Sequence, residues 1–563
     1  MLRSGTGRSS TYRRAWNASI PTALAIDFTY PYLDSRVTFT RADSTTCATY
    51  FNSSGVLATA AANVARFDYD PSAPLGVTGA SVVSNGNFNG LTGWATTGAA
   101  TASVVGGYAA VTNSSNYADG LSQTITTVAG LTYRVTFTGY SSGTYAIQNF
   151  DGNAPYGNLA NQQFSNTSPV VNTFTFKANS SLSTITIVPY NASSAQIVYV
   201  GSVSVQQVTF TPRGLLIEES RTNLLTYSRD MTNAAWTKTA ATTTKNQVGI
   251  DGVANAATQV LDTAISAQHF INGTATTVAT TVYTFSAVLK QSGSLPWVIF
   301  GQDAVGTGFF TVNLSTGAFG TTVSGVYTSR SIQNLGGGWY RVSITYSAAN
   351  TTAAGAIYIS GNGDSATPTY TGTGSNGFIC DYAQLEVGAF ATSPIATTSA
   401  AVTRAADSAV MTGTNFTSWY NATQGTFVGK VFSPIGGALN GIFSVNDGTG
   451  NNKMDMRVGA GNSAFNSVGG ISQGTFPLGT GVTHAATVHK VGLAYQANNF
   501  ICAVDAATTG AGGTSVTGSV PTVTQLQIGN IDGGTSYPLD GWIQSLTYYP
   551  TALSSAQLQA LTT

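Results

Sequence analysis

The sequence predicts an all-β protein made of tandem antiparallel β-sandwiches. Tyr133, Val135 and Phe137 alternate with polar residues, as do the apolar residues of 340–346, and this period of two is typical of half-buried strands. Such runs recur at short spacing between clusters of Gly, Asn and Ser, and no long stretch shows helical periodicity. Only 8% of the 563 residues are charged, and 63 are glycine, so small polar side chains replace charged ones.

The N-terminal segment 1–26 is predicted to be a basic arm. It contains no acidic residue, and its basic residues are Arg3, Arg8, Arg13 and Arg14. Such an arm suits docking onto an acidic surface of a partner protein, so these four arginines are candidate attachment residues, with a frayed terminus as the alternative. The arm lacks the continuous apolar stretch of a secretory signal, and we therefore expect no export by the usual route.

An internal repeat predicts two related sandwiches. The run TTVAGLTYRVTF from Thr126 matches TTVATTVYTFSA from Thr276, with Tyr133 and Tyr283 in register. The strand patterns around the two runs bound the sandwiches at about 78–208 and 229–404. After them, a helix is expected at the C-terminus, where Ser554 and Gln557 fit a capping box.

Composition excludes two classes of partner. The formal net charge is zero, so the electrostatic attraction that nucleic-acid binding requires is missing. No run of eighteen apolar residues occurs, and we expect no membrane insertion.

Two separated segments of the chain form a recognisable pair. They are RVTFTRADSTTCATYFNSSGVLATAAANVARFDYDP (36–71) and RGLLIEESRTNLLTYS (213–228), and they resemble a signature shared by tailed-bacteriophage virion structural proteins, in which the two pieces are nearly contiguous. The resemblance implies a small anchor module formed by 27–77 and continued at 209–228, into which the sandwich 78–208 is inserted.

Later segments resemble sugar-binding folds. GGGWYRVSITYSA from Gly336, AQLEVG and AAVTRAAD are similar to a sandwich module of the same phage proteins, which has the plan of a jelly-roll carbohydrate-binding module. HKVGLAYQANNFICAVD, LQIGNID and LDGWIQSLTYYPTALSSAQLQAL resemble the final strands of concanavalin A-like or laminin-G-like lectin domains. The resemblance therefore implies two jelly-roll modules followed by a concanavalin A-like sandwich at 405–563.

No catalytic centre is expected. Glycosidases of the concanavalin A-like fold need two carboxylates roughly 5–10 Å apart. The chain has three glutamates, Glu218, Glu219 and Glu386, and none lies in 405–563. Glu218 and Glu219 are adjacent, so on a strand they point to opposite faces, and we predict ion pairs with Arg213 or Arg221 instead.

A bound cofactor is not expected, with Ca²⁺ as the one open alternative. Asp447 lies in NDGTG and Asp532 in IDGG, and loop carboxylates are ligands that Ca²⁺ prefers. An Asp followed by Gly is more often part of a hairpin turn, which is the favoured interpretation of both residues.

Exposed aromatic residues are the candidates for glycan binding. Trp297, Trp419 and Tyr537 lie near predicted turns, where their rings could stack on sugars, with packing at a module interface as the alternative. The other tryptophans of the module signatures are assigned to cores, namely Trp94, Trp236, Trp339 and Trp542.

Taken with the resemblance, these observations predict a non-enzymatic structural protein of a phage virion. We expect a fibre or other appendage, attached by its N-terminal region to other virion proteins and displaying glycan-binding-type domains to host surface glycans. A homo-oligomer is expected, and trimers are common in fibres. It would be assembled in the bacterial host cytoplasm and located in the virion. The alternatives are a purely structural decoration or baseplate protein without sugar binding and, ranked last, a capsule depolymerase.

Overall fold

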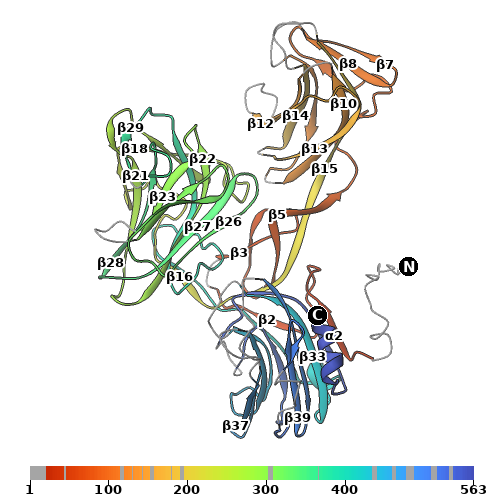
Figure 1. Ribbon diagram of the computed structural model, residues 1–563, viewed down its shortest axis with the longest axis vertical. Coiled ribbons are helices and arrows are strands. Elements are labelled where there is room, and N and C mark those ends of the chain that lie inside the picture. The colour runs from red at the N-terminus through yellow and green to blue at the C-terminus, as the bar shows by residue number, and fades with distance from the viewer. Residues whose placement is uncertain are drawn as a thin grey trace.

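Antiparallel β-strands build almost the whole chain, which forms three lobes in the computed structural model (Figure 1). The all-β class and the antiparallel sandwiches that the sequence predicts are confirmed. No helix in the described part of the chain is long and apolar enough to span a membrane. The structure describes residues 21–43, 46–113, 119–129, 131–141, 144–151, 158–178, 180–189, 196–301, 308–365, 367–433, 440–458, 464–476, 487–508, 517–531 and 537–563.

The first sandwich lies at the top of Figure 1 and corresponds to the inserted module. Side chains of β10 alternate between half-buried and buried, as the period of two predicts, and Tyr133, Val135 and Phe137 enter the core. One sheet contains β7 (Thr101–Val105), β8 (Tyr108–Asn113), β15 (Gln196–Ile217), β10 (Thr132–Ser141) and β13 (Val170–Lys177). The facing sheet contains β12 (Asn158–Phe164), β11 (Tyr145–Asp151), β14 (Leu182–Pro189), β9 (Leu121–Thr126) and β6 (Ala95–Thr96).

The second sandwich repeats this plan with two six-stranded sheets. The repeat extends to a side-chain contact, because the N–H of Val128 donates to the Tyr133 hydroxyl at 3.1 Å and that of Val278 to Tyr283 at 3.0 Å. One sheet contains β17 (Trp236–Thr239), β21 (Phe270–Thr276), β28 (Thr352–Ile359), β23 (Trp297–Gly301), β24 (Phe309–Asn313) and β25 (Ala318–Ser324). The other contains β18 (Ala241–Gln247), β19 (Ala257–Asp262), β30 (Gly377–Val387), β22 (Val282–Ser292), β27 (Trp339–Ser347) and β26 (Ser329–Asn334), and β20 (Ser266–Gln268) pairs with β29 (Thr369–Thr371).

The third sandwich is C-terminal but also uses the start of the chain. Its strands β1 and β2 come from residues 24–40, so this segment belongs to the third sandwich and not to the predicted arm (1–26) and anchor module (27–77). Phe28 and Val37 enter its core. One sheet contains β1 (Leu24–Asp27), β42 (Gly541–Tyr549), β33 (Gln424–Phe432), β38 (Val488–Gln496), β39 (Asn499–Val504) and β40 (Ala507–Thr508). The other contains β2 (Thr38–Thr40), β32 (Ser408–Thr412), β41 (Gln525–Ile528), β34 (Asn440–Asn446), β35 (Lys453–Val458), β36 (Ala464–Val468) and β37 (Ile471–Phe476).

Two short helices belong to the described part of the third sandwich, α1 (Thr414–Thr417) and α2 (Ser555–Thr562). The capping box of α2 is confirmed: the Ser554 N–H donates to Gln557 Oε1 at 2.9 Å, and the Gln557 N–H donates to Ser554 Oγ at 3.4 Å.

One strand joins the first and third sandwiches. The 22-residue β15 pairs with β8 and β10 in the first sandwich, then with β5 (Arg66–Thr78), and finally through Leu215–Ile217 with β42 of the third. Since these pairings share one strand, a single sheet runs through both sandwiches.

The second sandwich is held by the anchor segment. A hairpin of β3 (Ala48–Phe51) and β4 (Leu57–Ala60) places Phe51 and Leu57 against Val288, Trp339 and Tyr382 on the outer face of β22, β27 and β30. The strand β16 (Arg221–Asn223) pairs with β31 (Val402–Arg404), so both ends of the second sandwich meet beside this hairpin.

Candidate functional site

The three aromatic residues predicted to bind glycans lie in different environments. Trp419 is only 7% exposed and belongs to the core of the third sandwich, with its ring centroid 5.1 Å from that of Tyr548. The short helix α1 turns it inward, and its Nε1 donates to the Asn415 carbonyl at 2.7 Å. Trp419 is therefore not an exposed turn residue. Trp297 is half-buried at the start of β23, while Tyr537 is 48% exposed.

Asp447 has the contacts of a turn residue. Its Oδ1 accepts from the N–H of Thr449 at 2.9 Å and from the hydroxyl of Thr449 at 2.6 Å, and its Oδ2 accepts from Asn452 at 2.8 Å. In the described ranges, no group of three or more His, Cys, Asp or Glu could hold a metal ion. The other calcium candidate, Asp532, lies outside the described residues, as do the arm residues Arg3, Arg8, Arg13 and Arg14.

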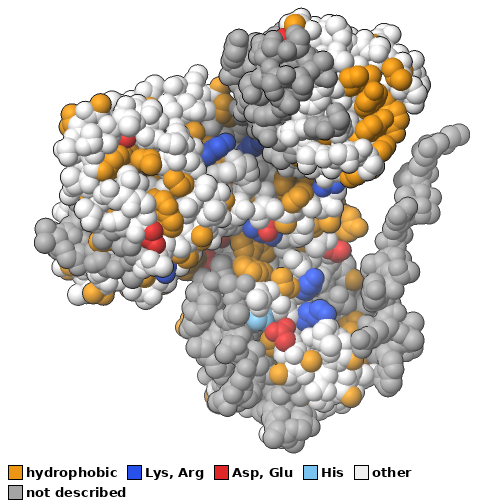
Figure 2. Space-filling view, turned by 45° about the horizontal axis from the view of Figure 1, so that its top comes forward, with side chains coloured by type: hydrophobic (Ala, Val, Ile, Leu, Met, Phe, Trp, Pro, Cys, Tyr) orange, Lys and Arg blue, Asp and Glu red, His pale blue; other side chains and the backbone are white. Residues whose placement is uncertain are grey.

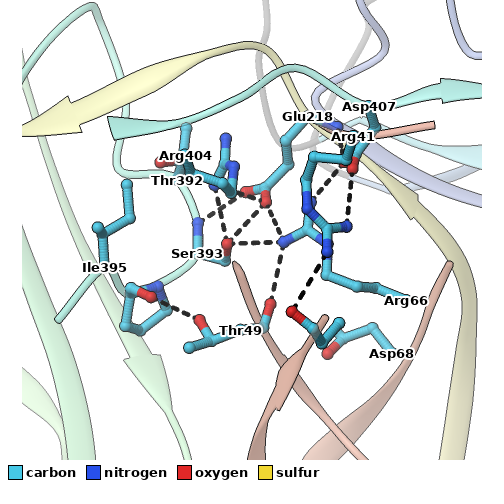
Figure 3. Close-up of polar contacts among 12 residues, drawn as sticks. Arg41, Thr49, Arg66, Asp68, Glu218, Thr392, Ser393, Ile395, Arg404 and Asp407 are labelled. Carbon is cyan, nitrogen blue, oxygen red and sulfur yellow. Dashed lines mark hydrogen bonds and ion pairs between the residues drawn. The ribbon is translucent and has the colours of Figure 1, made fainter. Parts of the chain in front are cut away.

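A buried ion cluster lies where the anchor segment, the second sandwich and the third sandwich meet (Figure 3). Arg66 Nη1 is 2.6 Å from Glu218 Oε2, and Arg404 Nη1 is 2.8 Å from the same oxygen. Arg66 also pairs with Asp407, whose other oxygen lies 3.2 Å from Arg41 Nη1. We call these five residues the ion cluster, and each is at most 5% exposed.

Strand ends position the members of the ion cluster. Arg66 begins β5, Glu218 directly follows β15, and Arg404 ends β31. Ser393 adds a neutral link, because its N–H and its hydroxyl both donate to the Glu218 carboxylate, at 2.6 and 2.7 Å. The cluster therefore fastens three parts of the chain together at one point.

The electrostatics of the ion cluster favour permanent charge. Burial raises the pKa of Glu218, but the adjacent Arg404 and Arg66 guanidinium groups outweigh it and lower that pKa to about 2. Burial acts against the charge of Arg66 as well, yet Asp407 and Glu218 raise its pKa above the ordinary value. A glycosidase acid needs a raised pKa so that it can carry a proton, so Glu218, whose pKa is lowered, suits a structural role.

The other two glutamates also have hydrogen-bond or ion-pair partners within the protein. Buried Glu386 accepts from Gln384 at 2.7 Å and from the Thr392 hydroxyl at 2.7 Å, and Glu219 pairs with Arg221. The predicted pairing with Arg221 is thus found for Glu219. For Glu218, neither predicted partner is used.

The partners of Glu218 and Arg213 were missed by sequence reasoning. Arg213 pairs with Asp68 at 3.4 Å and Asp70 at 3.2 Å. One signal in the sequence could have indicated buried ion pairs. Charged residues are rare in this chain, yet Arg66 in ARFD and Arg404 in VTRAAD each lie next to apolar residues.

Asp540 lies next to the ion cluster and has a raised pKa. Burial is the main cause, and the Glu219 carboxylate adds to it. Its Oδ1 accepts from the Glu219 N–H at 2.8 Å, and the residue is only 7% exposed. A carboxyl group so enclosed and bonded to the main chain is poorly placed to reach a glycosidic oxygen.

Three half-buried tyrosines gather on the outer face of the first sandwich. Tyr108 of β8, Tyr199 of β15 and Tyr140 of β10 point away from the core, and we call them the tyrosine cluster. Figure 2 shows a hydrophobic patch over the lobe that carries β7 and β8. Nothing in the sequence pattern distinguished these residues from other outward positions of half-buried strands.

Comparison with known proteins gives only structural neighbours. No family model matches the sequence, and no curated protein matches it. One similar solved structure is the CBM40 of Ruminococcus gnavus IT-sialidase bound to α2,3-sialyllactose, with 18% identity and a TM-score of 0.22 over 25% of this chain and 84% of that one.

Two further similar structures are also carbohydrate-binding modules. A CBM4 structure has 19% identity and a TM-score of 0.20 over 22% of this chain and 99% of its own. The tandem CBM22-1–CBM22-2 domain of Paenibacillus barcinonensis Xyn10C has 11% identity and a TM-score of 0.19 over 56% of this chain and 99% of its own. At these identities and TM-scores the similarity does not indicate what this chain binds or does.

Proposed function

We propose that this chain is a structural protein of a bacteriophage virion, of the fibre or appendage type, which attaches by its N-terminal region and displays glycan-binding-type sandwiches to the host surface. The observation that supports the adhesive part is the tyrosine cluster, because three aromatic rings lie only half-buried on the outer face of the first sandwich, in the lobe farthest from the third sandwich. Surfaces that hold sugars combine such rings with a few polar groups.

The connections between the sandwiches support a structural role. The shared strand β15, the ion cluster and the β3–β4 hairpin join them without a flexible linker. Lys177 of the first sandwich also donates to the Ile250 carbonyl of the second at 2.8 Å. A body of this kind holds its outer faces in fixed positions, which suits repeated display on a particle.

The use of the glutamates supports a function without catalysis. All three accept hydrogen bonds or form ion pairs inside the fold, and Glu218 is held ionised. Other virion proteins and further copies of this chain complete the proposal as partners, and it includes no cofactor.

A glycan array probed with the purified full-length chain tests the proposal. We expect saturable binding to a subset of host surface glycans, detected at high glycan density because single sites can be weak. The same preparation should release no reducing sugar from host polysaccharide. A chain that binds no glycan would favour the purely structural alternative, and sugar release would favour a depolymerase.

A further inference from the structure

We infer that the tyrosine cluster binds a ring of a neutral glycan, an assignment that rests on the adhesive function proposed above. Two of its tyrosines face each other across neighbouring strands: Tyr140 and Tyr199 are register partners, their ring centroids are 4.9 Å apart, and their planes differ by 13°. Each ring supports the other, so this stacked pair holds its orientation without a ligand.

The third ring of the cluster, that of Tyr108, lies at nearly a right angle to the ring of Tyr140. Tyr108 lies across Gly201, where an added Cβ would come within 2.8 Å of the ring. Its plane is at 84° to that of Tyr140, with the centroids 5.5 Å apart. The ring of Tyr108 therefore lies nearly perpendicular to the ring of Tyr140, which is stacked on Tyr199. A glycine at position 201 is needed because a side chain there would overlap the Tyr108 ring.

The equivalent face of the second sandwich is covered by another part of the chain and can be compared with the face that carries the tyrosine cluster. By the repeat and the strand register, Lys290 and Ile379 take the places of Tyr140 and Tyr199. Ile379 packs against the cluster that contains Phe51 and Leu57 of the β3–β4 hairpin. Among the described residues, the first sandwich has no counterpart of that hairpin over its tyrosines.

The chemistry of the two faces also differs. Beside the covered face of the second sandwich, Arg229 pairs with Asp381 at 2.6 Å and with Asp251 at 2.7 Å. Around the tyrosine cluster, the strand segments 101–113, 135–141, 170–176 and 196–212 contain no charged residue. The covered face of the second sandwich thus has charged side chains beside it, whereas these segments around the tyrosine cluster have none.

This absence of charge defines the class of glycan. The carboxylate of a sialic or uronic acid, or a sulfate group, would lose water on this face without meeting a cation in those segments. A neutral pyranose needs only an apolar surface for its C–H face and hydroxyl partners for its rim. Tyrosine rings supply the first, and the tyrosine hydroxyls with Thr112, Thr138 and Ser202 supply the second.

The test compares variants of the full-length chain on an array of neutral hexose and N-acetylhexosamine oligosaccharides beside sialylated, uronic and sulfated ones. Wild type should bind neutral glycans, with an affinity that stays constant between about 0.05 and about 0.5 M salt because no ion pair contributes. Tyr108→Ala and Tyr140→Ala should weaken binding by about tenfold, and Tyr108→Phe, which keeps the ring and removes one hydroxyl, should weaken it less. Tyr30→Ala, at a 66% exposed position in the third sandwich, is the matched control.

The outcomes separate this inference from the function on which it rests. If wild type binds neutral glycans and Tyr108→Ala binds equally well, the inference is wrong and adhesion stands. Binding that is confined to acidic glycans and weakens with salt would also show that the inference is wrong while the adhesive function stands. If no glycan binds, both fail, and a loss of self-association in folded Tyr108→Ala would then assign the cluster to a contact between copies of the chain. Unchanged thermal unfolding shows that each variant is folded.

Discussion

Glu218 and Arg66 are 152 residues apart in the sequence and 2.6 Å apart in the ion cluster. Their contact joins the end of β15 to the start of β5, at the position where the anchor segment, the second sandwich and the third sandwich meet. Because both groups are buried, each is costly to leave alone, and the pair therefore makes the arrangement of the sandwiches sensitive to single substitutions.

Removing the Glu218 charge should destabilise the protein strongly. In Glu218→Gln, Arg66 and Arg404 lose the carboxylate that compensates them in a buried site, at a cost of about 3–5 kcal/mol. Calorimetric unfolding should show a lower Tm. Lys245→Gln is the control, because the paired side chains of Lys245 and Asp230 are 37% and 29% exposed and the loss of their ion pair should change stability little. Equal effects of the two substitutions would contradict the structural role of the ion cluster.

The same carboxylate predicts a loss of stability in acid. The folded pKa of Glu218, about 2, lies below its ordinary value of 4.5. Its contribution is therefore fully present above 4.5 and is lost as the pH falls through that value towards 2. The Tm difference between wild type and Glu218→Gln should shrink over this window. A difference that stays constant would show that the charge of Glu218 does not matter.

The raised pKa of Asp540 predicts the opposite dependence of stability on pH. Burial raises its folded pKa above the ordinary value of 3.8, so its contribution is greatest below 3.8 and is lost as the pH rises through the folded pKa. Asp540→Asn keeps the oxygen that accepts from Glu219 and removes the charge, so Tm at neutral pH should rise, by about 2–4 °C for each kcal/mol gained in a domain of this size. Below 3.8 the variant and wild type should converge. A lower Tm at neutral pH would count against this account.

Trp419 and Tyr537 should respond differently to truncation. Trp419→Ala removes a core ring beside Tyr548, at a cost of about 3–5 kcal/mol, whereas Tyr537→Ala removes a 48% exposed one and should leave stability nearly unchanged. Denaturant unfolding of both variants measures the contrast. Comparable losses would mean that Tyr537 is also a packing residue.

Asp447 should not determine any response to calcium. Its carboxylate oxygens already accept from Thr449 and Asn452 within the turn. We expect a Ca²⁺ titration followed by thermal unfolding to give the same curve for wild type and Asp447→Asn. A Ca²⁺-dependent rise in Tm that Asp447→Asn abolishes would restore the metal interpretation.

Period-two alternation predicted strands well where one face meets solvent and less well where both faces are covered. Tyr133, Val135 and Phe137 are buried between half-buried neighbours, as expected. In β27, however, Arg341, Ser343 and Thr345 are buried as well, because parts of the chain remote from β27 also cover its polar face: the Arg341 guanidinium donates to the carbonyl of Thr392, and Thr345 donates to that of Ala389. A local pattern carries no information about such a second layer.

The candidate sites depended on tertiary arrangement more than on sequence pattern. Arg66 and Arg404 reach Glu218 from distant segments, and no spacing rule connects them. Trp419 looked exposed because a turn was expected there, yet one turn of helix directs it inward. Tyr108 and Tyr140 become neighbours only because Gly201 leaves room for a ring.

The continuity of β15 has a mechanical consequence. Its 22 residues extend about 70 Å at the usual rise of a strand, and they are bonded laterally to β10, β5 and β42 along the way. A pull on the first sandwich along β15 loads those hydrogen bonds in shear, so that many must break together, whereas a linker between domains would simply straighten. A force applied along β15 to a ligand bound on the first sandwich is therefore transmitted to the third sandwich with little elastic extension.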